Sequence, residues 1–182
     1  NATALSLRGM MRLAKDDLPG ARKDLDEAAG IEPRNGAVQH GRGQVALRDE
    51  RYDDAIEAFT RAADLSPGNL DALLKRTGAY LALEQMDKAL ADLDEAIKAN
   101  PAYFEAEMMR AGLLAAVGRP DEALKMVDEV LKQGLVDAQA LILRGEILAR
   151  LGRADEADQA YAASIALQPT VSAYLTRAAY QP

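Results

Sequence analysis

The sequence has no cysteine, no tryptophan and a single histidine. Without cysteine, the chain can form neither a disulfide framework nor a thiolate metal site. With one histidine, a transition-metal site would have to be completed by carboxylates alone. Aromatic residues make up only 4% of the chain, so alanine and leucine have to fill the interior. We therefore expect closely packed helices rather than a core built on aromatic rings.

The chain also lacks an apolar run long enough to span a bilayer, which argues against membrane insertion. Its formal net charge is −7. An acidic surface argues against nucleic acid as a partner, because neutralising phosphates needs clustered lysine and arginine. We expect a soluble protein, cytoplasmic by default, and the absence of cysteine leaves a periplasmic or secreted location open. The start at Asn1-Ala2 without methionine indicates either a scar of tag removal or an internal start in a longer protein.

The sequence repeats itself every 34 residues. A fixed period in the range of roughly 20–50 residues indicates an array of repeats, each of which buries its apolar face only by stacking on its neighbours. Alanine recurs at this spacing at Ala21, Ala55, Ala89, Ala123 and Ala157. Proline recurs at Pro33, Pro67, Pro101 and Pro169, with Leu135 in the missing slot.

The second repeat illustrates the pattern. Counted from Gly36 as position 1, it has small residues at positions 8, 20 and 27, an aromatic residue at 24 and a proline at 32. These residues are Gly43, Ala55, Phe59, Ala62 and Pro67. The fourth repeat departs most, because Lys132-Gln133-Gly134-Leu135 replaces the closing proline. The pattern resembles the tetratricopeptide repeat (TPR), a helix–turn–helix unit.

The resemblance covers nearly the whole chain and implies an all-α fold, a right-handed superhelical solenoid of antiparallel helix pairs. We expect a single TPR domain over residues 1–182, with repeats at about 2–35, 36–69, 70–103, 104–137 and 138–171 and a terminal helix at about 171–181. The helix pairs are expected at about 3–15 and 18–31, 37–49 and 52–65, 71–83 and 86–99, 104–117 and 120–133, and 138–151 and 154–167. The terminal helix either caps the last apolar face or belongs to a longer protein that continues beyond it.

An arginine recurs at position 7 of every repeat, where TPR sequences usually carry an apolar residue. The column consists of Arg8, Arg42, Arg76, Arg110 and Arg144. At about 100° per residue, position 7 falls on the stripe of the helix that meets other helices. It lies away from the positions that face the concave groove in the TPR family. We therefore expect these arginines to bury their stems and pair their heads, with Asp24 and Asp92 at position 23 as candidate partners. A ladder for carboxylates or phosphates is the disfavoured alternative.

Signals of catalysis are weak. The DLDEA segments at 24–28 and 92–96 provide paired carboxylates, but no twelve-residue calcium loop with a central glycine surrounds them. Gly41-Arg42-Gly43 lies inside an expected helix and does not follow a strand, so it is no phosphate-binding loop. We predict no catalytic residue, no cofactor and no metal site, and hence a protein that is not an enzyme.

The resemblance implies a concave groove lined by positions 2, 5, 9 and 12. The candidate partner-contacting residues are Met10, His40, Gln44, Leu47, Asp71, Leu74, Leu81, Glu105, Met108, Ile142 and Glu146. Leu74, Met108 and Ile142 share position 5, and we expect them to form one apolar strip that is partly exposed in the free protein. His40 is interpreted as a groove side chain with Asp71 and Gln44 near it.

Some TPR domains clamp a chaperone's C-terminal carboxylate with lysine and asparagine at positions 2, 5, 6 and 9, and of these slots only Lys75 is retained here. The leading hypothesis is a scaffold that binds a peptide or helix of a partner protein, with apolar side chains and with Lys or Arg beside them. One alternative is a self-association module that forms a homodimer. A second alternative is a regulatory or spacer segment of a larger enzyme.

Overall fold

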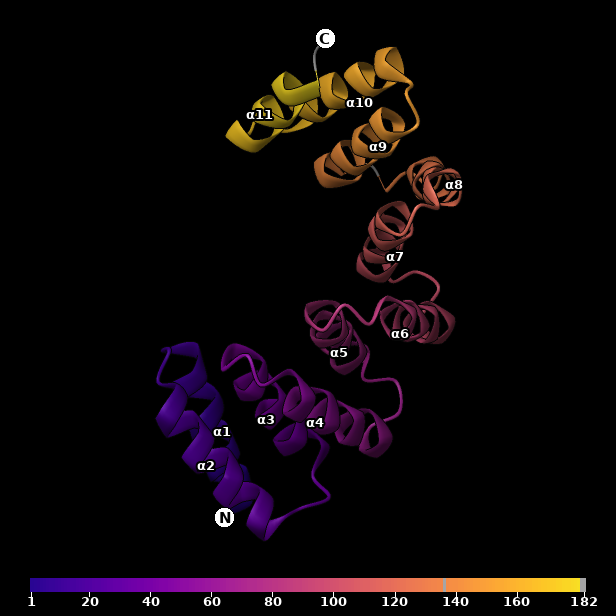
Figure 1. Ribbon diagram of the computed structural model, residues 1–182. Coiled ribbons are helices and arrows are strands. Elements are labelled where there is room, and N and C mark those ends of the chain that lie inside the picture. The colour runs from indigo at the N-terminus through magenta and orange to yellow at the C-terminus, as the bar shows by residue number, and fades with distance from the viewer. Residues whose placement is uncertain (136, 181–182) are drawn as a thin grey trace. The chain divides into compact units, whose positions relative to one another are not determined.

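The computed structural model describes residues 1–135 and 137–180, and within them every regular element is a helix. Figure 1 shows the helices α1 (Ala2–Ala14), α2 (Leu18–Ile31), α3 (Gly36–Arg48), α4 (Tyr52–Leu65), α5 (Leu70–Ala82), α6 (Met86–Ala99), α7 (Phe104–Ala116), α8 (Pro120–Lys132), α9 (Ala138–Arg150), α10 (Ala154–Leu167) and α11 (Val171–Tyr180). The all-α class and the paired helices are confirmed, with bounds that agree with the expected ones to within a residue. The expected last residue of the terminal helix, Gln181, lies outside the described residues.

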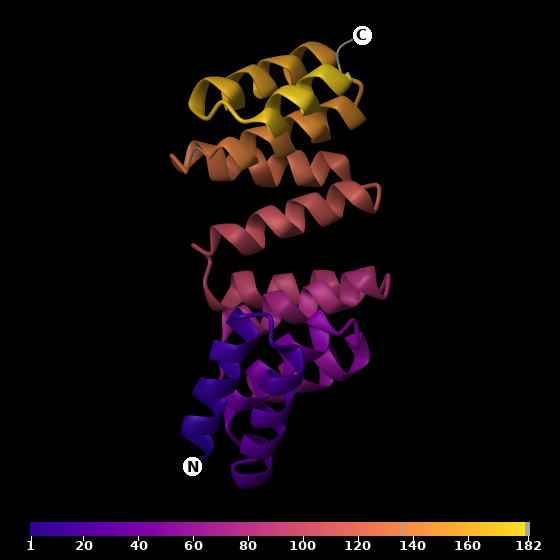
Figure 2. The same ribbon diagram turned by 90° about the vertical axis from the view of Figure 1, so that its left-hand side faces the viewer.

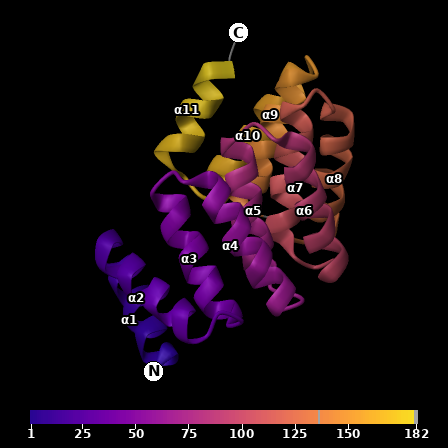
Figure 3. The same ribbon diagram turned by 60° about the horizontal axis from the view of Figure 1, so that its bottom comes forward.

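The helices fall into two compact units, Asn1–Pro101 and Ala102–Pro182. In the first unit, α1 packs on α2, α3 on α4 and α5 on α6, and each pair also contacts the next (Figure 3). In the second unit, α7 packs on α8 and α9 on α10, and α11 covers the last pair (Figure 2). Because the connections inside a pair are short, the two helices of each pair run antiparallel.

Short polar caps and left-handed turn residues set the helix bounds. Asparagine or aspartate side chains accept backbone N–H groups at the starts of α1, α2, α3, α5 and α9. The turn inside a pair needs a positive φ at position 15, which Gly118 and Gly152 supply in the fourth and fifth repeats. In the first three repeats Asp16, Glu50 and Glu84 adopt the same conformation, which the sequence pattern did not predict.

Small residues at position 8 let the two helices of a pair approach. An added Cβ at Gly43 would lie 2.7 Å from the ring of Phe59, and one at Gly145 would lie 2.4 Å from the ring of Tyr161. In the fourth repeat, Ala111 takes the same slot opposite the smaller Val127, and both are fully buried. In these three repeats the larger ring at position 24 goes with glycine at position 8, and the smaller valine goes with alanine.

The arginine column pairs with aspartates in two ways. As predicted, Arg8 binds Asp24 and Arg76 binds Asp92 in the second helix of the same repeat, with N–O distances of 2.6–2.8 Å. The other two pairs, which the sequence analysis missed, join Arg42 to Asp26 at 2.9 Å and Arg144 to Asp128 at 2.7 Å. In these pairs the aspartate is at position 25 of the preceding repeat, because alanine occupies position 23 of the arginine's own repeat.

Burial within the column is uneven. The Arg76 side chain is 13% exposed and also donates to Thr60 of α4, whereas Arg8 is 57% exposed because no described helix precedes α1. The expectation of a buried stem is therefore wrong for Arg8. Its hydrogen bonds still hold the pKa of Asp24 below the usual value, and burial of that carboxyl works in the opposite direction.

Candidate functional site

A cavity of ≈590 Å³ lies between α7 and α9 in the second unit. Its floor is apolar and its rim carries carboxylates. The lining residues are Phe104, Glu105, Met108, Met109, Asp137, Gln139, Ile142, Leu143 and Glu146. Neither lysine nor arginine is among them, so the cavity combines an apolar floor with a formal charge of one sign.

Helical spacing brings these side chains together. On α7, Met108 and Met109 lie one turn beyond Phe104 and Glu105, so all four face the same side. On α9, Glu146 lies one turn beyond Ile142 in the same way. Asp137 caps α9 by accepting the backbone N–H of Gln139 at 3.1 Å, which holds its carboxylate at the rim.

Four of the predicted groove residues meet in this cavity: Glu105, Met108, Ile142 and Glu146. Met108 is partly exposed, as expected. The expected exposure is wrong for Leu74 and Ile142, which are only 6% and 8% exposed. Each lies on a first helix that contacts both helices of the preceding repeat, α3 and α4 for Leu74 and α7 and α8 for Ile142. Leu74 belongs to the first unit, so a continuous strip from Leu74 to Ile142 stays a prediction.

The sequence analysis missed Phe104, Met109, Asp137 and Leu143, which line the cavity from outside the family's groove positions. The sequence contains a pattern that could have indicated two of these residues. Met109 and Leu143 take position 6, which holds glycine in the second repeat and lysine in the third. An apolar pair at positions 5 and 6 in consecutive repeats could have indicated a wider apolar floor.

The remaining predicted residues lie in the first unit, and two of them, Gln44 and Asp71, lie beside His40. The His40 ring is 14% exposed, and its Nε2 lies 3.0 Å from Asp71 Oδ2 and 2.9 Å from the Gln44 amide. The ring also meets the edge of Phe59, with centroids 5.5 Å apart. The expected proximity of His40, Asp71 and Gln44 is therefore confirmed.

Burial determines the charge of His40. Desolvation lowers the pKa of the imidazole below its usual value, Asp71 opposes this shift, and Lys75 adds to it. Within the described residues, Nδ1 is buried without a hydrogen-bond partner. A proton at Nδ1 would therefore lack an acceptor, which disfavours the doubly protonated, charged ring.

The other three candidates have mixed surroundings. Met10 packs against the cluster of Leu13 and Leu25, and Leu47 packs against the cluster that includes Phe59. Leu81 is half-buried, and Asp71 is exposed beside His40. These side chains contribute to packing between helices as well as to the surface.

Two features of the described residues bear on other functions. Across residues 1–135 and 137–180, no three histidine or acidic side chains converge as a metal site would need. Over the same ranges, none of the helices combines the length and apolar character required to cross a membrane.

Comparison with known proteins identifies the family. The sequence model described as "Tetratricopeptide repeat" matches residues 6–69, 40–104, 74–124 and 108–172. The chain belongs to the tetratricopeptide repeat family. The TPR fold supports a protein–protein interaction scaffold, and helix pairs stacked in sequence form its framework. No curated protein matches the sequence of this TPR chain.

Solved TPR structures share the fold at low sequence identity. A TPR protein from Parabacteroides merdae ATCC 43184 is 23% identical, with a TM-score of 0.88 over 98% of this chain and 72% of that one. YrrB, described as a TPR protein with an unusual peptide-binding site, is 24% identical, with a TM-score of 0.76 over 96% and 90%. The first TPR of Spaghetti (RPAP3), bound to the HSP90 peptide SRMEEVD, is 20% identical, with a TM-score of 0.60 over 64% and 92%.

Proposed function

We propose that this TPR chain is a non-catalytic scaffold whose second unit binds a peptide or helix of a partner protein in the cavity between α7 and α9. The ligand presents an apolar side chain to Met108, Met109 and Leu143. Lysine or arginine beside this side chain faces the carboxylates of Glu105 and Glu146.

The observation that carries the proposal is an apolar floor whose charged lining residues are all carboxylates. A volume of ≈590 Å³ lies within the range typical of ligand sites, roughly 300–1,000 Å³. Methionine side chains are flexible and polarizable, so Met108 and Met109 adapt to anchors of different shape. The carboxylates add attraction for a basic ligand and repulsion for an acidic one.

The relatives support a peptide ligand and also limit its chemistry. YrrB is described as having a peptide-binding site, and the RPAP3 domain holds SRMEEVD. The present chain retains only Lys75 of the carboxylate-clamp slots, and a rim with three carboxylates would repel an acidic peptide. The proposed ligand is therefore basic and apolar.

Fluorescence anisotropy with short labelled peptides tests the proposal. One series places Leu, Met or Phe between lysines, and the matched series places the same anchors between glutamates. We expect binding of the lysine series only, and weaker binding after Met108→Gln or Glu146→Lys. Glu129→Lys is the matched control, because it changes the net charge equally at an exposed site of α8 outside the cavity lining. Equal loss of binding in Glu129→Lys and Glu146→Lys would show that overall charge alone drives association.

A second candidate is self-association, favoured by exposed apolar side chains on α1. Leu7 and Met11 are each 63% exposed and lie one turn apart on one side of the helix. An apolar pair of this kind is available to a second copy of the chain. Light scattering of the wild type and of the double variant Leu7→Gln/Met11→Gln tests this candidate. The wild type should be a dimer, and the double variant should be a monomer. A wild-type monomer at high concentration would exclude it.

A further inference from the structure

Four arginines surround a second cavity, of ≈330 Å³, formed by α2, α3 and α4 in the first unit. Arg22 comes from α2, Arg42 from α3, Arg51 from the turn before α4, and Arg61 from α4. The floor consists of the buried side chains Leu25, Val45, Ala46 and Ala58. The peptide cavity of the second unit shares none of these residues, so the inference does not depend on the proposed function.

Two of these arginines depart from the repeat pattern. Arg22 takes position 21, which holds Ile56, Leu90 or Leu124 in the next three repeats. Arg61 takes position 26, which holds glutamate in the first, third and fourth repeats. Neither substitution is required by the packing of the repeat, and both add positive charge to one cavity of a chain whose net charge is −7.

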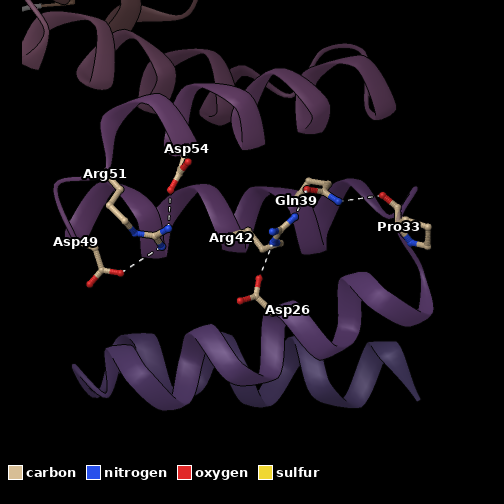
Figure 4. A network of polar contacts seen from close by, with 7 residues as sticks. All are labelled: Asp26, Pro33, Gln39, Arg42, Asp49, Arg51 and Asp54. Carbon is tan, nitrogen blue, oxygen red and sulfur yellow. Dashed lines mark hydrogen bonds and ion pairs between the residues drawn. The ribbon is translucent and has the colours of Figure 1, made fainter.

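Hydrogen bonds within the cavity orient the guanidinium groups of these arginines. Arg42 donates from Nε to Asp26 at 2.9 Å and from Nη1 to Gln39 at 3.3 Å (Figure 4). Gln39 is 1% exposed and fixed by its own bond to the Pro33 carbonyl at 2.9 Å. Each guanidinium has five N–H donors and uses one or two of them here, so donors remain for a ligand.

A carboxylate of the chain itself, outside the cavity lining, pairs with two of these arginines. Oδ2 of Asp49 pairs with both Arg22 and Arg51, the latter at 3.5 Å. Asp49 is the C-cap of α3, where the helix dipole disfavours negative charge. The paired guanidinium groups offset this cost. The lining carboxylates Asp26, Asp54 and Glu57 are 51–63% exposed, and each forms an ion pair with a lining arginine for which an incoming oxyanion would compete.

We propose that the cavity between α2 and α4 is an oxyanion-binding site, which takes a phosphate or carboxylate group. Guanidinium groups bind both groups through two parallel N–H donors. The group belongs either to a free anion or to an acidic or phosphorylated side chain of a protein. Arg51 and Arg61 hold the incoming group, and Asp49 competes with it for Arg22 and Arg51.

The test is a titration of the full chain with inorganic phosphate at constant ionic strength, observed at the arginine Nε–Hε signals by NMR. We expect saturable shifts at Arg22, Arg42, Arg51 and Arg61, and at least about tenfold weaker binding in Arg51→Gln, as loss of a charge-assisted hydrogen bond predicts. Asp49→Asn should bind phosphate several-fold more tightly, because it removes the competing charge.

Arg153→Gln is the matched control. Arg153 occupies the same position 16 as Arg51 and pairs three residues on with Glu156 as Arg51 does with Asp54. Phosphate binding should be unchanged in this variant. If Arg51→Gln unfolds, Arg61→Gln replaces it, because the Arg61 side chain is 54% exposed.

Three results would overturn the proposal: no saturable shift, equal shifts at Arg153, or weaker binding after Asp49→Asn. A parallel titration with a phosphoserine peptide separates the two sources. Tighter binding of the peptide than of inorganic phosphate assigns the site to a side chain of a partner protein. Equal binding assigns it to a free anion.

Discussion

Gly43 on α3 provides a direct test of how closely the helices of a pair approach. An alanine Cβ at this position would lie 2.7 Å from two carbons of the Phe59 ring, well inside ordinary van der Waals contact. Overpacking of a buried site costs roughly 1–3 kcal/mol. Alanine also gains about 0.8–1 kcal/mol of helix propensity over glycine. We therefore expect Gly43→Ala to lower the free energy of unfolding by about 0–2 kcal/mol.

Gly78 on α5 is the matched control, because within the described residues an added Cβ there would meet no neighbour within 4 Å. Gly78→Ala should gain the propensity alone and stabilise the protein by about 0.8–1 kcal/mol. The difference between the two variants removes the propensity and isolates the steric cost, about 1–3 kcal/mol. Denaturant unfolding followed by circular dichroism measures both variants.

A double-mutant cycle checks the assigned contact. Phe59→Val leaves a cavity and is destabilising alone, but Gly43→Ala/Phe59→Val reproduces the Ala111 and Val127 pair of the fourth repeat. The double variant should therefore be more stable than the sum of the single changes predicts. Additive effects, or stabilisation by Gly43→Ala as large as that by Gly78→Ala, would refute the close approach of α3 to α4.

Three further predictions concern other contacts. Arg76→Leu should destabilise by about 3–5 kcal/mol, since it leaves the nearly buried Asp92 unpaired, and Arg76→Leu/Asp92→Ala should recover most of this loss in the same unfolding assay. His40 has a pKa below its usual value, so the folded chain prefers the neutral ring. The free energy of unfolding should therefore be constant above about pH 6.5 and should fall as the pH is lowered from there. The His40→Gln variant should show a smaller dependence of this free energy on pH between about pH 7.5 and 5.5. Ala89 is 0% exposed on α6, so Ala89→Leu should cost about 1–3 kcal/mol, and an unchanged midpoint would place the residue outside the helix contact.

The sequence predicted the helices well because the constraints that define them repeat. Position 8 faces position 24 in every pair, and the proline after the second helix cannot continue it. The turn at position 15 takes a positive φ, which glycine favours and which Gly118 and Gly152 supply in the fourth and fifth repeats. Asp16, Glu50 and Glu84 adopt the same positive φ, because the helix pair on either side imposes the turn and overrides the local preference.

The exposure of the groove was harder to predict. Leu74 and Met108 share position 5, yet Leu74 is buried and Met108 is partly exposed. The position of a residue in the repeat determines the direction of its side chain. The exposed fraction of that side chain also depends on the residues of the neighbouring repeat. The same reason explains the aspartate partners of Arg42 and Arg144, because the preceding repeat supplies them and alanine occupies position 23 of each arginine's own repeat.

The two candidate cavities indicate where a repeat protein can vary. Positions 8, 20 and 27 bring helix backbones together, so a change there costs stability directly. Positions 6, 21 and 26 hold residues of different types in different repeats, and they include Met109, Arg22 and Arg61 of the two cavities. The residues that repeat in the sequence therefore identify the helical framework. Candidate binding sites are found at positions where one repeat carries a different type of residue from the others. The second unit has apolar side chains beside an acidic rim and the first has arginines around one cavity, so the two proposed sites would take ligands of different charge.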